Sequence, residues 1–369
     1  MRILFAFTGG RGHVEPLVPL AEAARAAGHT VAFGGRGSIL PAVEALVFEA
    51  FATETGTKPP ERLPLQPVDL ERERRDFRDG FVLRSRERIP GVVELCREWR
   101  PDVVVGEETH YAALAAAELL GLPCASVVVL AAATLATPDL VAEPLRQVRE
   151  EAGLPPDPDT SMVSRQLVLA PLPPSFRDPA QPLPAATVHY RPFDEAPPPY
   201  EGLPRVYFTL GTVFNLESGD LFARVLAGLA ELEVEVVATV GAAIDPAELG
   251  PQLRRIRIER FVPQAELLAT SSVVVSHGGS GSLLGALAHG LPQVLIPMGA
   301  DQPFNAARAA QLGVARVLDP VAATPEDVRD AVAAVLEQPS YREAAGQLQA
   351  EFVALPGPAH AVSLLERLR

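Results

Sequence analysis

The chain contains little cysteine and little lysine, and each shortage excludes a class of protein. Its two cysteines, Cys96 and Cys124, are too few for a disulfide framework or for a zinc site built on four thiolates. Lys58 is the only lysine, and the 46 acidic residues outnumber the 32 basic ones, which gives a net charge of −14. A surface of that sign argues against binding to nucleic acid.

Long hydrophobic runs are absent as well. The apolar residues 3–7 end at two glycines, too early for the core of a signal peptide, and the longest apolar stretch, residues 126–136, is well short of the roughly 20 residues that span a membrane. We therefore expect a cytoplasmic protein with no membrane span. With 369 residues, of which 48% are hydrophobic, the chain is long enough to form two domains, each with its own core.

Strand-like and helix-like segments alternate along the chain and restart midway. In the first half, strands are predicted at residues 2–7, 30–33, 101–106 and 124–130, and helices at 18–27 and 111–120. In the second half, strands are predicted at 205–210, 235–240, 257–260 and 273–275, and helices at 220–232 and 283–289. This alternation is typical of doubly wound α/β sheets and predicts two such domains.

A proline-rich segment separates the two halves. Residues 171–204 carry too many prolines for a helix or a central strand. We therefore predict an N-terminal domain over residues 1–185, a linker over 186–204, a C-terminal domain over 205–350 and a terminal helical segment over 351–369.

The most informative motif is a turn of small residues between the predicted strand 273–275 and the predicted helix 283–289. It reads Ser276-His277-Gly278-Gly279-Ser280-Gly281-Ser282. Small residues let a ligand approach the backbone, and a helix that begins after them points unpaired N–H groups and the positive end of its dipole at an anion. The pattern therefore predicts a cradle for a diphosphate.

Two further segments flank this turn along the chain. Phe261-Val262-Pro263-Gln264 precedes it by about one strand and one helix, and Gly299-Ala300-Asp301-Gln302-Pro303-Phe304-Asn305 follows the next apolar run, residues 293–297. In a parallel sheet, the loops that follow successive strands gather at one edge. We therefore expect all three segments to face the same crevice.

The glycine-rich turn after the first predicted strand contains a histidine. It reads Thr8-Gly9-Gly10-Arg11-Gly12-His13-Val14-Glu15-Pro16. It fails as a dinucleotide fingerprint, because Glu15 occupies the third glycine position and the second predicted strand ends without an acidic residue, so NAD binding is disfavoured. His13 is then either a cap or surface residue, or a base that faces the crevice between the domains.

These motifs, in this order and spacing, resemble GT-B glycosyltransferases of the family 1 type, which glycosylate small natural products from UDP- or dTDP-sugars. The resemblance implies two Rossmann-like doubly wound domains that face each other across a cleft, with the terminal helix crossing back to the N-terminal domain. It also implies inverting, metal-independent transfer from a nucleoside-diphosphate sugar to a hydroxyl of a small hydrophobic acceptor. No cofactor beyond that co-substrate is implied, and the enzyme would be a monomer or a homodimer.

The resemblance also assigns donor-binding residues. An apolar residue and a Pro-Gln pair hold the base, the His-Gly-Gly turn holds the diphosphate, and an acidic residue followed by glutamine holds the sugar hydroxyls. Matched to this sequence, the donor-binding set is Gly12, Thr212, Phe261, Val262, Gln264, His277, Gly278, Gly279, Ser280, Gly281, Ser282, Asp301 and Gln302.

The resemblance makes His13 the base that removes the acceptor's proton. Such an imidazole needs a carboxylate to hold its other nitrogen. The family has an aspartate there, whereas this sequence has Glu107, one methylene longer, so Glu108, Asp102 or a water could take the role instead. His110, in the same loop, either lines the acceptor pocket or is an exposed loop residue.

Two charged segments are ambiguous from sequence. Residues 71–88 alternate in sign, which predicts a solvated helix face, although in the resembled family this region flanks the acceptor pocket. Asp157 and Asp159 have the spacing of a metal-binding pair, but they lie among prolines with no preceding strand. We therefore predict a loop there, and no metal site.

Two other functions stay open at this point. A transferase with a lipid-linked envelope-precursor acceptor also carries a glycine-rich N-terminal turn with a Gly-His pair, but it needs an apolar, basic surface that docks on a membrane. A non-catalytic helper could keep the fold in order to bind a catalytic partner. The retention of His13 and of the donor segments argues against that alternative.

Overall fold

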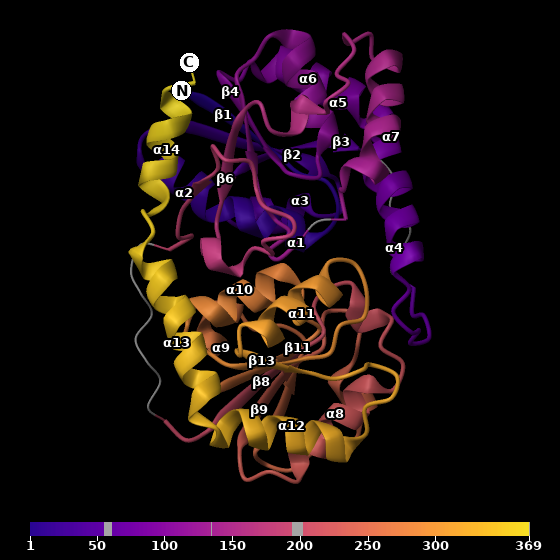
Figure 1. Cartoon of the computed structure of the whole chain (residues 1–369), viewed down its shortest axis with the longest axis vertical. Coiled ribbons are helices and arrows are strands. Elements are labelled where there is room, and N and C mark those ends of the chain that lie inside the picture. Colours follow the sequence, from indigo (N-terminus) through magenta and orange to yellow (C-terminus); the bar gives the residue numbers. More distant parts are fainter. Residues whose placement is uncertain (55–60, 134, 194–201, 369) are drawn as a thin grey trace.

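The computed structural model describes residues 1–54, 61–133, 135–193 and 202–368. They form two α/β domains stacked along the long axis of the molecule (Figure 1). The strand order is β3-β2-β1-β4-β5-β6-β7 in the N-terminal sheet and β10-β9-β8-β11-β12-β13 in the C-terminal sheet. Paired strands run parallel in both sheets. The predicted fold class of two doubly wound domains is confirmed.

The N-terminal domain contains most of the predicted elements and adds several short ones. Its strands are β1 (Arg2–Ala6), β2 (Thr30–Arg36), β3 (Glu49–Glu54), β4 (Val103–Glu107), β5 (Cys124–Val127), β6 (Leu167–Ala170) and β7 (Val188–His189). Its helices are α1 (Arg11–Val14), α2 (Val18–Ala26), α3 (Leu40–Glu44), α4 (Leu70–Phe77), α5 (Ser85–Trp99), α6 (Tyr111–Leu120) and α7 (Pro138–Glu151).

The C-terminal domain repeats the plan. Its strands are β8 (Arg205–Thr209), β9 (Glu235–Thr239), β10 (Ile256–Glu259), β11 (Val273–Ser276), β12 (Gln293–Leu295) and β13 (Ala315–Val317). Its helices are α8 (Leu221–Ala230), α9 (Gln264–Leu268), α10 (Ser280–Ala288), α11 (Gln302–Gln311), α12 (Pro325–Glu337), α13 (Pro339–Ala354) and α14 (Pro358–Glu366).

The central strands are apolar because helices cover both faces of each sheet. β4 and β11 are buried along their whole length, which explains their runs of valine. β1 lies between β2 and β4, and β8 lies between β9 and β11, so the direction of winding reverses beside each first strand. Such switch points leave a crevice at the carboxyl ends of the strands, where ligands bind. The loops after β1, β4, β8 and β11 are therefore placed for function.

The predicted linker does not begin where the N-terminal sheet ends. Val188 and His189 form β7, which pairs with β6 at the edge of that sheet, and Tyr190 is fully buried. The N-terminal domain therefore extends past the predicted boundary at residue 185. An edge strand tolerates neighbouring prolines, since one side of it needs no partner. The rest of the predicted linker falls largely on residues 194–201, outside the described part of the chain.

The C-terminal helix belongs structurally to the N-terminal domain. In Figure 1, α13 and α14 run along one side of the molecule and bring the C-terminus next to the N-terminus. On α14, Ala361, Val362 and Leu365 are buried in the core that surrounds β1, and His29 Nε2 lies 3.0 Å from a carboxylate oxygen of Glu366. The two domains are thus linked by a second crossing of the chain.

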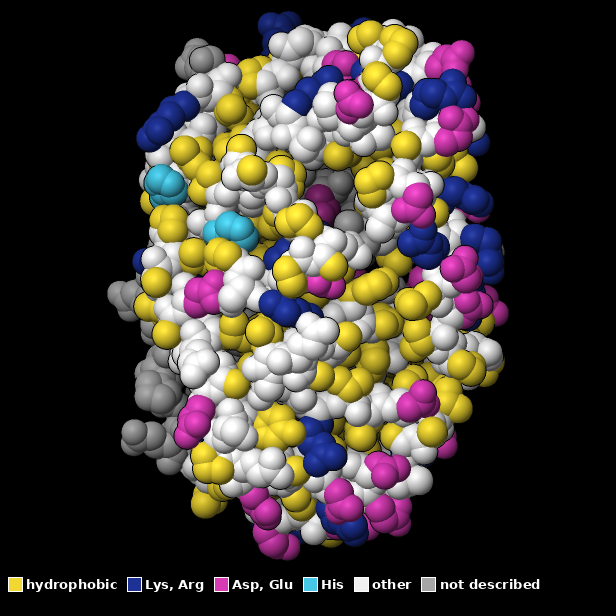
Figure 2. All heavy atoms as spheres, in the orientation of Figure 1, with side chains coloured by type: hydrophobic (Ala, Val, Ile, Leu, Met, Phe, Trp, Pro, Cys, Tyr) yellow, Lys and Arg dark blue, Asp and Glu magenta, His cyan; other side chains and the backbone are white. Residues whose placement is uncertain are grey.

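Charged side chains of both signs are interspersed along the side of the molecule formed by α4 and α7, at the right of Figure 2. Arg74 pairs with Asp139 across these two helices at 2.6 Å, and Arg78 pairs with Asp79 at 2.7 Å. The alternating charges predicted for a solvated helix face thus lie largely at the surface. In the part of the chain that the structure describes, no helix combines the length and apolar character needed to cross a membrane.

Candidate active site

In each domain, the first strand is followed by a turn in which a glycine lies against a histidine ring. Gly9 follows β1 with a φ of +81°, and a Cβ added there would lie 2.6 Å from His13 Cδ2 and 2.8 Å from Nε2. Gly211 follows β8 with a φ of +74°, and its added Cβ would lie 2.6 Å from His277 Nε2. A residue with a side chain would be strained at these positive φ values, and its Cβ would collide with the histidine ring. Glycine at both turns therefore leaves the Nε2 edge of a histidine unobstructed.

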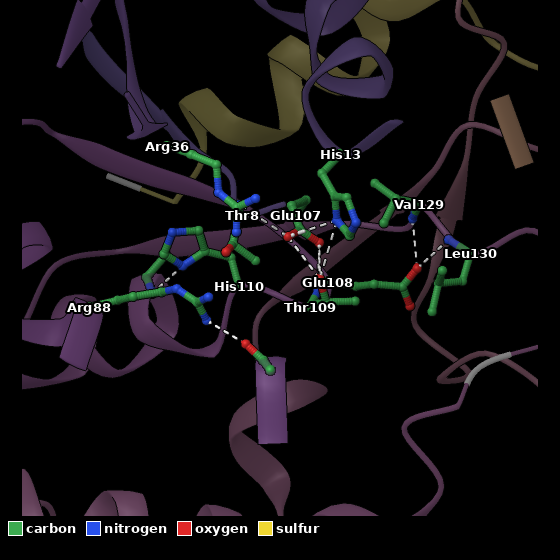
Figure 3. A network of polar contacts seen from close by, with 12 residues as sticks. Thr8, His13, Arg36, Arg88, Glu107, Glu108, Thr109, His110, Val129 and Leu130 are labelled. Atoms are coloured by element: carbon green, nitrogen blue, oxygen red, sulfur yellow. Dashed lines mark hydrogen bonds and ion pairs between the residues drawn. The ribbon is translucent and has the colours of Figure 1, made fainter. Parts of the chain in front are cut away.

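His13 lies against a carboxylate from the neighbouring strand (Figure 3). Its Nδ1 is 3.2 Å from Oε1 of Glu107, the last residue of β4, and 21% of the His13 side chain is exposed whereas Glu107 is fully buried. Thr109 Oγ1 donates to Glu107 at 2.8 Å and lies 3.4 Å from His13 Nδ1. The backbone N–H groups of Thr8 and Thr109 also donate to this carboxylate, at 3.3 and 2.7 Å.

These contacts determine the charge states of the pair. Burial by itself would lower the pKa of His13, but the charge of Glu107 and its hydrogen bond to the ring raise that pKa above its ordinary value. Burial would raise the pKa of Glu107, but His13 and the hydrogen bond from Thr109 lower it. The pair therefore consists of an ionised glutamate and a histidine of increased basicity, as a general base requires.

The other carboxylates considered for this role have different partners. Glu108 Oε1 accepts the N–H groups of Val129 and Leu130, both at 2.6 Å, at the end of β5. Burial raises the pKa of Glu108 to about 7. Asp102 accepts the N–H of Arg2 at 2.8 Å, at the opposite end of the strand. Of these candidates, the structure brings Glu107 to His13.

His110 is neither exposed nor free at both ring nitrogens. It is 2% exposed, and its Nδ1 accepts the N–H of Ala113 at 3.0 Å, so the side chain caps the N-terminus of α6. Burial lowers its pKa. The alternative of an exposed loop residue is therefore wrong, because the helix that follows needs a cap at a buried position.

Sequence reasoning missed an aromatic stack on His13. The Phe81 ring stacks on the His13 ring, with centroids 5.3 Å apart and planes at 23°, and Phe77 stacks on Phe81 at 5.2 Å. Phe81 lies in a π-helical turn, Arg78–Leu83, whose widened geometry is common at functional sites. The i,i+4 spacing of Phe77 and Phe81 was the available sequence signal for their stacking. No sequence pattern predicts the π-helical turn that brings Phe81 to His13.

The predicted diphosphate turn lies at the N-terminus of α10. Gly279 is the N-cap residue, and a Cβ added to it would lie 2.5 Å from His277 Nε2. Burial lowers the pKa of His277 to about 4, so its ring is neutral. Gly278 has a φ of +82°, and its N–H lies 3.2 Å from Ser276 Oγ. Gly281 and Ser282 follow in the first turn of α10.

The predicted sugar-binding residues are held in polar networks. Asp301 Oδ2 accepts Ser280 Oγ at 2.5 Å and Asn305 Nδ2 at 2.8 Å, and burial raises the pKa of Asp301. Gln302 Oε1 accepts the N–H of Met298 at 2.8 Å. Ser280, expected at the diphosphate, thus also orients Asp301. Asn305 joins the same network.

This network crosses between the domains. Ser280 Oγ accepts the N–H of Ala131 at 2.8 Å, and Asn305 Oδ1 accepts the N–H of Ala132 at 3.0 Å. Both alanines belong to the loop after β5 of the N-terminal domain. The charge of Asp301 is also one of the causes that raise the pKa of His13.

The remaining predicted donor residues follow the first strand of the N-terminal sheet or the strands β8 and β10 of the C-terminal sheet. Phe261 is 61% exposed, and the guanidinium carbon of Arg11 lies 5.1 Å from the centre of its ring. Val262 is partly buried, and Gln264 begins α9. Thr212 follows Gly211 and is exposed, and Gly12, in α1, is exposed beside His13.

Asp157, one of the acidic pair among the prolines, is held by hydrogen bonds. It accepts the N–H and the hydroxyl of Ser161 at 3.1 and 2.6 Å, at the start of the short helical turn Ser161–Val163. Within residues 1–54, 61–133, 135–193 and 202–368, no three His, Cys, Asp or Glu side chains are grouped closely enough to hold a metal ion.

Comparison with known proteins places the chain in a family. Residues 223–368 match the family described as erythromycin biosynthesis protein CIII-like, C-terminal domain. The chain is 32% identical to tylactone mycaminosyltransferase of Streptomyces fradiae, over 100% of this chain and 92% of that protein. It is 30% identical to 10-deoxymethynolide desosaminyltransferase of Streptomyces venezuelae, over 100% and 97%.

A solved structure agrees with these relatives. The crystal structure of glycosyltransferase VinC in complex with dTDP superposes with a TM-score of 0.78 at 26% identity, and the match covers 100% of this chain and 99% of that one. The chain therefore belongs to the natural-product glycosyltransferases of the GT-B fold.

Proposed function

We propose that this enzyme transfers a sugar from a dTDP-sugar to a hydroxyl of a small hydrophobic acceptor, with inversion at the anomeric carbon and without a metal ion. The observation that carries the proposal is the pair of His13 and Glu107, with His13 Nδ1 3.2 Å from the buried carboxylate. The domain that holds the pair is hydrogen-bonded to Ser280 and Asn305 of the other domain, and these two side chains also donate to Asp301.

The acceptor's proton goes to His13. Because Glu107 accepts the Nδ1 proton of the ring, the Nε2 lone pair is left for the incoming hydroxyl, and Gly9 keeps that edge clear. As Nε2 takes the proton, the acceptor oxygen forms a bond to the anomeric carbon while the bond from that carbon to the diphosphate oxygen breaks. Attack from the face opposite the leaving group inverts the centre.

The leaving group carries away the electron pair as negative charge on the diphosphate. The N-terminal turn of α10 supplies N–H groups and the positive end of a nine-residue helix to that charge. The neutral His277 imidazole, with glycines at its Nε2 edge, leaves room for the phosphates. These groups support charge stabilisation by the protein itself.

The relatives and the side chains around the site support a choice of nucleotide and of acceptor. VinC was crystallised with dTDP, and we infer the same nucleotide here, with Phe261 and Gln264 beside its thymine ring. Phe81 and Phe77 line the His13 side, and Phe304 of α11 packs against the same core from the other domain. Such apolar walls favour a hydrophobic acceptor, as do relatives that are named for a tylactone and a methynolide.

The test is His13→Ala, with His360→Ala as the matched control, because His360 is exposed on α14, which lies beside the two chain ends in Figure 1. We expect His13→Ala to bind dTDP as the wild type does and to lower transfer by roughly 10²–10⁴-fold, the usual range for general-base catalysis. Titration calorimetry measures the first quantity and product formation the second. Unchanged transfer would reject His13 as the base.

A further inference from the structure

A segment of the N-terminal domain lies on the C-terminal domain just before α4. Arg62 donates to Glu248 at 2.5 and 2.9 Å and to the carbonyl of Ala243 at 2.9 Å. The N–H of Leu63 donates to the carbonyl of Leu216 at 2.9 Å. Figure 1 shows this segment below α4, beside the lower domain. We call residues 61–69 the strap.

From the strap, α4 brings Glu73 to the loop that precedes Asp301. Glu73 Oε2 accepts the N–H of Ala300 at 2.9 Å, and the Glu73 side chain is 13% exposed. Arg72 Nη2 donates to the other oxygen at 3.1 Å. The carboxylate thus joins a helix of the N-terminal domain to the backbone of the other domain, and it lines a cavity together with Arg72 and Met298.

The loop is shaped to receive this carboxylate. Ala300 has a φ of +52°, a left-handed conformation that is uncommon for a residue with a side chain. A Cβ added to Gly299 would lie 2.9 Å from Glu73 Oε1 and 2.9 Å from the Phe214 ring. Glycine at 299 therefore permits the approach of Glu73, and the backbone at 300 turns its N–H toward it.

The loop is held from two directions. On its own side, Gln302 Oε1 accepts the N–H groups of Met298 and Gly299, at 2.8 and 3.3 Å. From the other domain, Glu73 accepts the next N–H along the chain, that of Ala300. Asp301 follows immediately, so its position depends on both anchors.

We propose that Glu73 is a positioning residue for the sugar subsite. Its carboxylate fixes the loop from 298 to 302 when the domains are together, and so sets Asp301 and Gln302 for the donor sugar. The inference rests on the proposed function, because it takes those two residues to contact the sugar. A separation of the domains would remove the acceptor from the Ala300 N–H, which couples the order of the sugar loop to closure.

The first test separates sugar from nucleotide. We compare Glu73→Ala, which removes the acceptor, with Glu73→Gln, which keeps an amide oxygen for Ala300, and with Glu71→Ala, an exposed position on the same helix. Binding of dTDP and of dTDP-glucose is measured by calorimetry, and kcat and KM are measured with the donor that supports turnover.

In Glu73→Ala we expect about a tenfold loss in kcat/KM, in keeping with the loss of a hydrogen bond to a charged group. We expect dTDP binding to stay within about twofold, because Glu73 reaches the sugar loop rather than the phosphates. Glu73→Gln should keep most of the activity, and Glu71→Ala should match the wild type. Equal weakening of dTDP binding, or equal losses in the Ala and Gln variants, would overturn the proposal.

The second test does not depend on turnover. Hydrogen exchange of the peptide that contains Ala300 should be faster in Glu73→Ala than in the wild type, while exchange in β11 stays the same. Unchanged exchange at Ala300 would overturn the proposal even if the enzyme is active. Faster exchange in an enzyme that transfers no sugar would leave the contact established and refute the proposed function instead.

Discussion

Replacing Glu107 with glutamine should invert the hydrogen bonding of the base. Both carboxylate oxygens face donors, since Oε2 accepts the Thr109 N–H at 2.7 Å and Oε1 accepts the Thr8 N–H at 3.3 Å and faces His13. An amide NH₂ can replace only one of these oxygens, and the position with the longer contact is the less unfavourable. The NH₂ group of the substituted side chain would then point at His13 Nδ1.

That change would move the ring hydrogen of neutral His13 from Nδ1 to Nε2. With a donor at Nδ1, the neutral ring accepts there and carries its hydrogen on Nε2, so Nε2 has no lone pair for the acceptor hydroxyl. In a catalytic triad, the corresponding exchange of carboxylate for amide lowers kcat by about 10⁴, so we expect a loss of roughly 10³–10⁴ here. Glu107→Asp keeps the charge but retracts the oxygens by about one C–C bond, ~1.5 Å, so its loss should be smaller.

The pH profile distinguishes this mechanism from a loss of folding. In the proposed mechanism His13 must be neutral to act, and its pKa is raised, so kcat/KM of the wild type should fall as the pH drops through a midpoint above 6.5. Because burial alone lowers that pKa and Glu107 raises it, the midpoint should move down in Glu107→Gln. A Gln variant as active as the wild type, or a midpoint that moves up, would refute this reasoning.

Three further results are expected. Gly279→Ala should weaken dTDP binding in calorimetry, because its Cβ would lie 2.5 Å from His277 Nε2, whereas Gly346→Ala, whose Cβ meets no atom within 4 Å, should leave binding unchanged; equal affinities would contradict the packing argument. Dialysis against EDTA should leave transfer undiminished, and a loss restored by Mg²⁺ would show that the ion stabilises the leaving group. His110→Ala should lower the free energy of unfolding by about 1 kcal/mol through loss of the α6 cap, and His110→Asn should recover part of it, as measured by chemical denaturation.

The fold was predictable because its signals are local and repeated. Runs of β-branched residues mark the buried strands, and glycines mark the turns after β1 and β8. β3 carried no such signal, since Glu49–Glu54 has a glutamate at each end and is only partly buried. β6 and β13 are short, and their pairing with β5 and β12 decides that they are strands. Such pairing is set by tertiary packing, which one sequence does not show.

The candidate site, too, has parts that could be predicted from the sequence and parts that could not. The turn around His277 was predictable because its residues are neighbours in the chain. Thr109 was not, although it donates to Glu107, because a threonine two residues past a strand has many possible partners. The hydrogen bond that the N–H of Ala131 donates to Ser280 Oγ spans 149 positions and depends on how the domains meet. The sequence left His110 either in the acceptor pocket or exposed on a loop for the same reason, since its burial is decided by the packing around α6.

The return of α14 to the N-terminal domain affects the order in which the two domains complete their folding. Val362 and Leu365 fill the core around β1, whose strand partners are synthesised long before them. While the chain emerges from the ribosome, that core has an apolar gap until residues 358–366 arrive. The C-terminal domain has a core of its own that contains no residue of α14, so this core can be completed first. The domain that is translated first is therefore the one that is completed last.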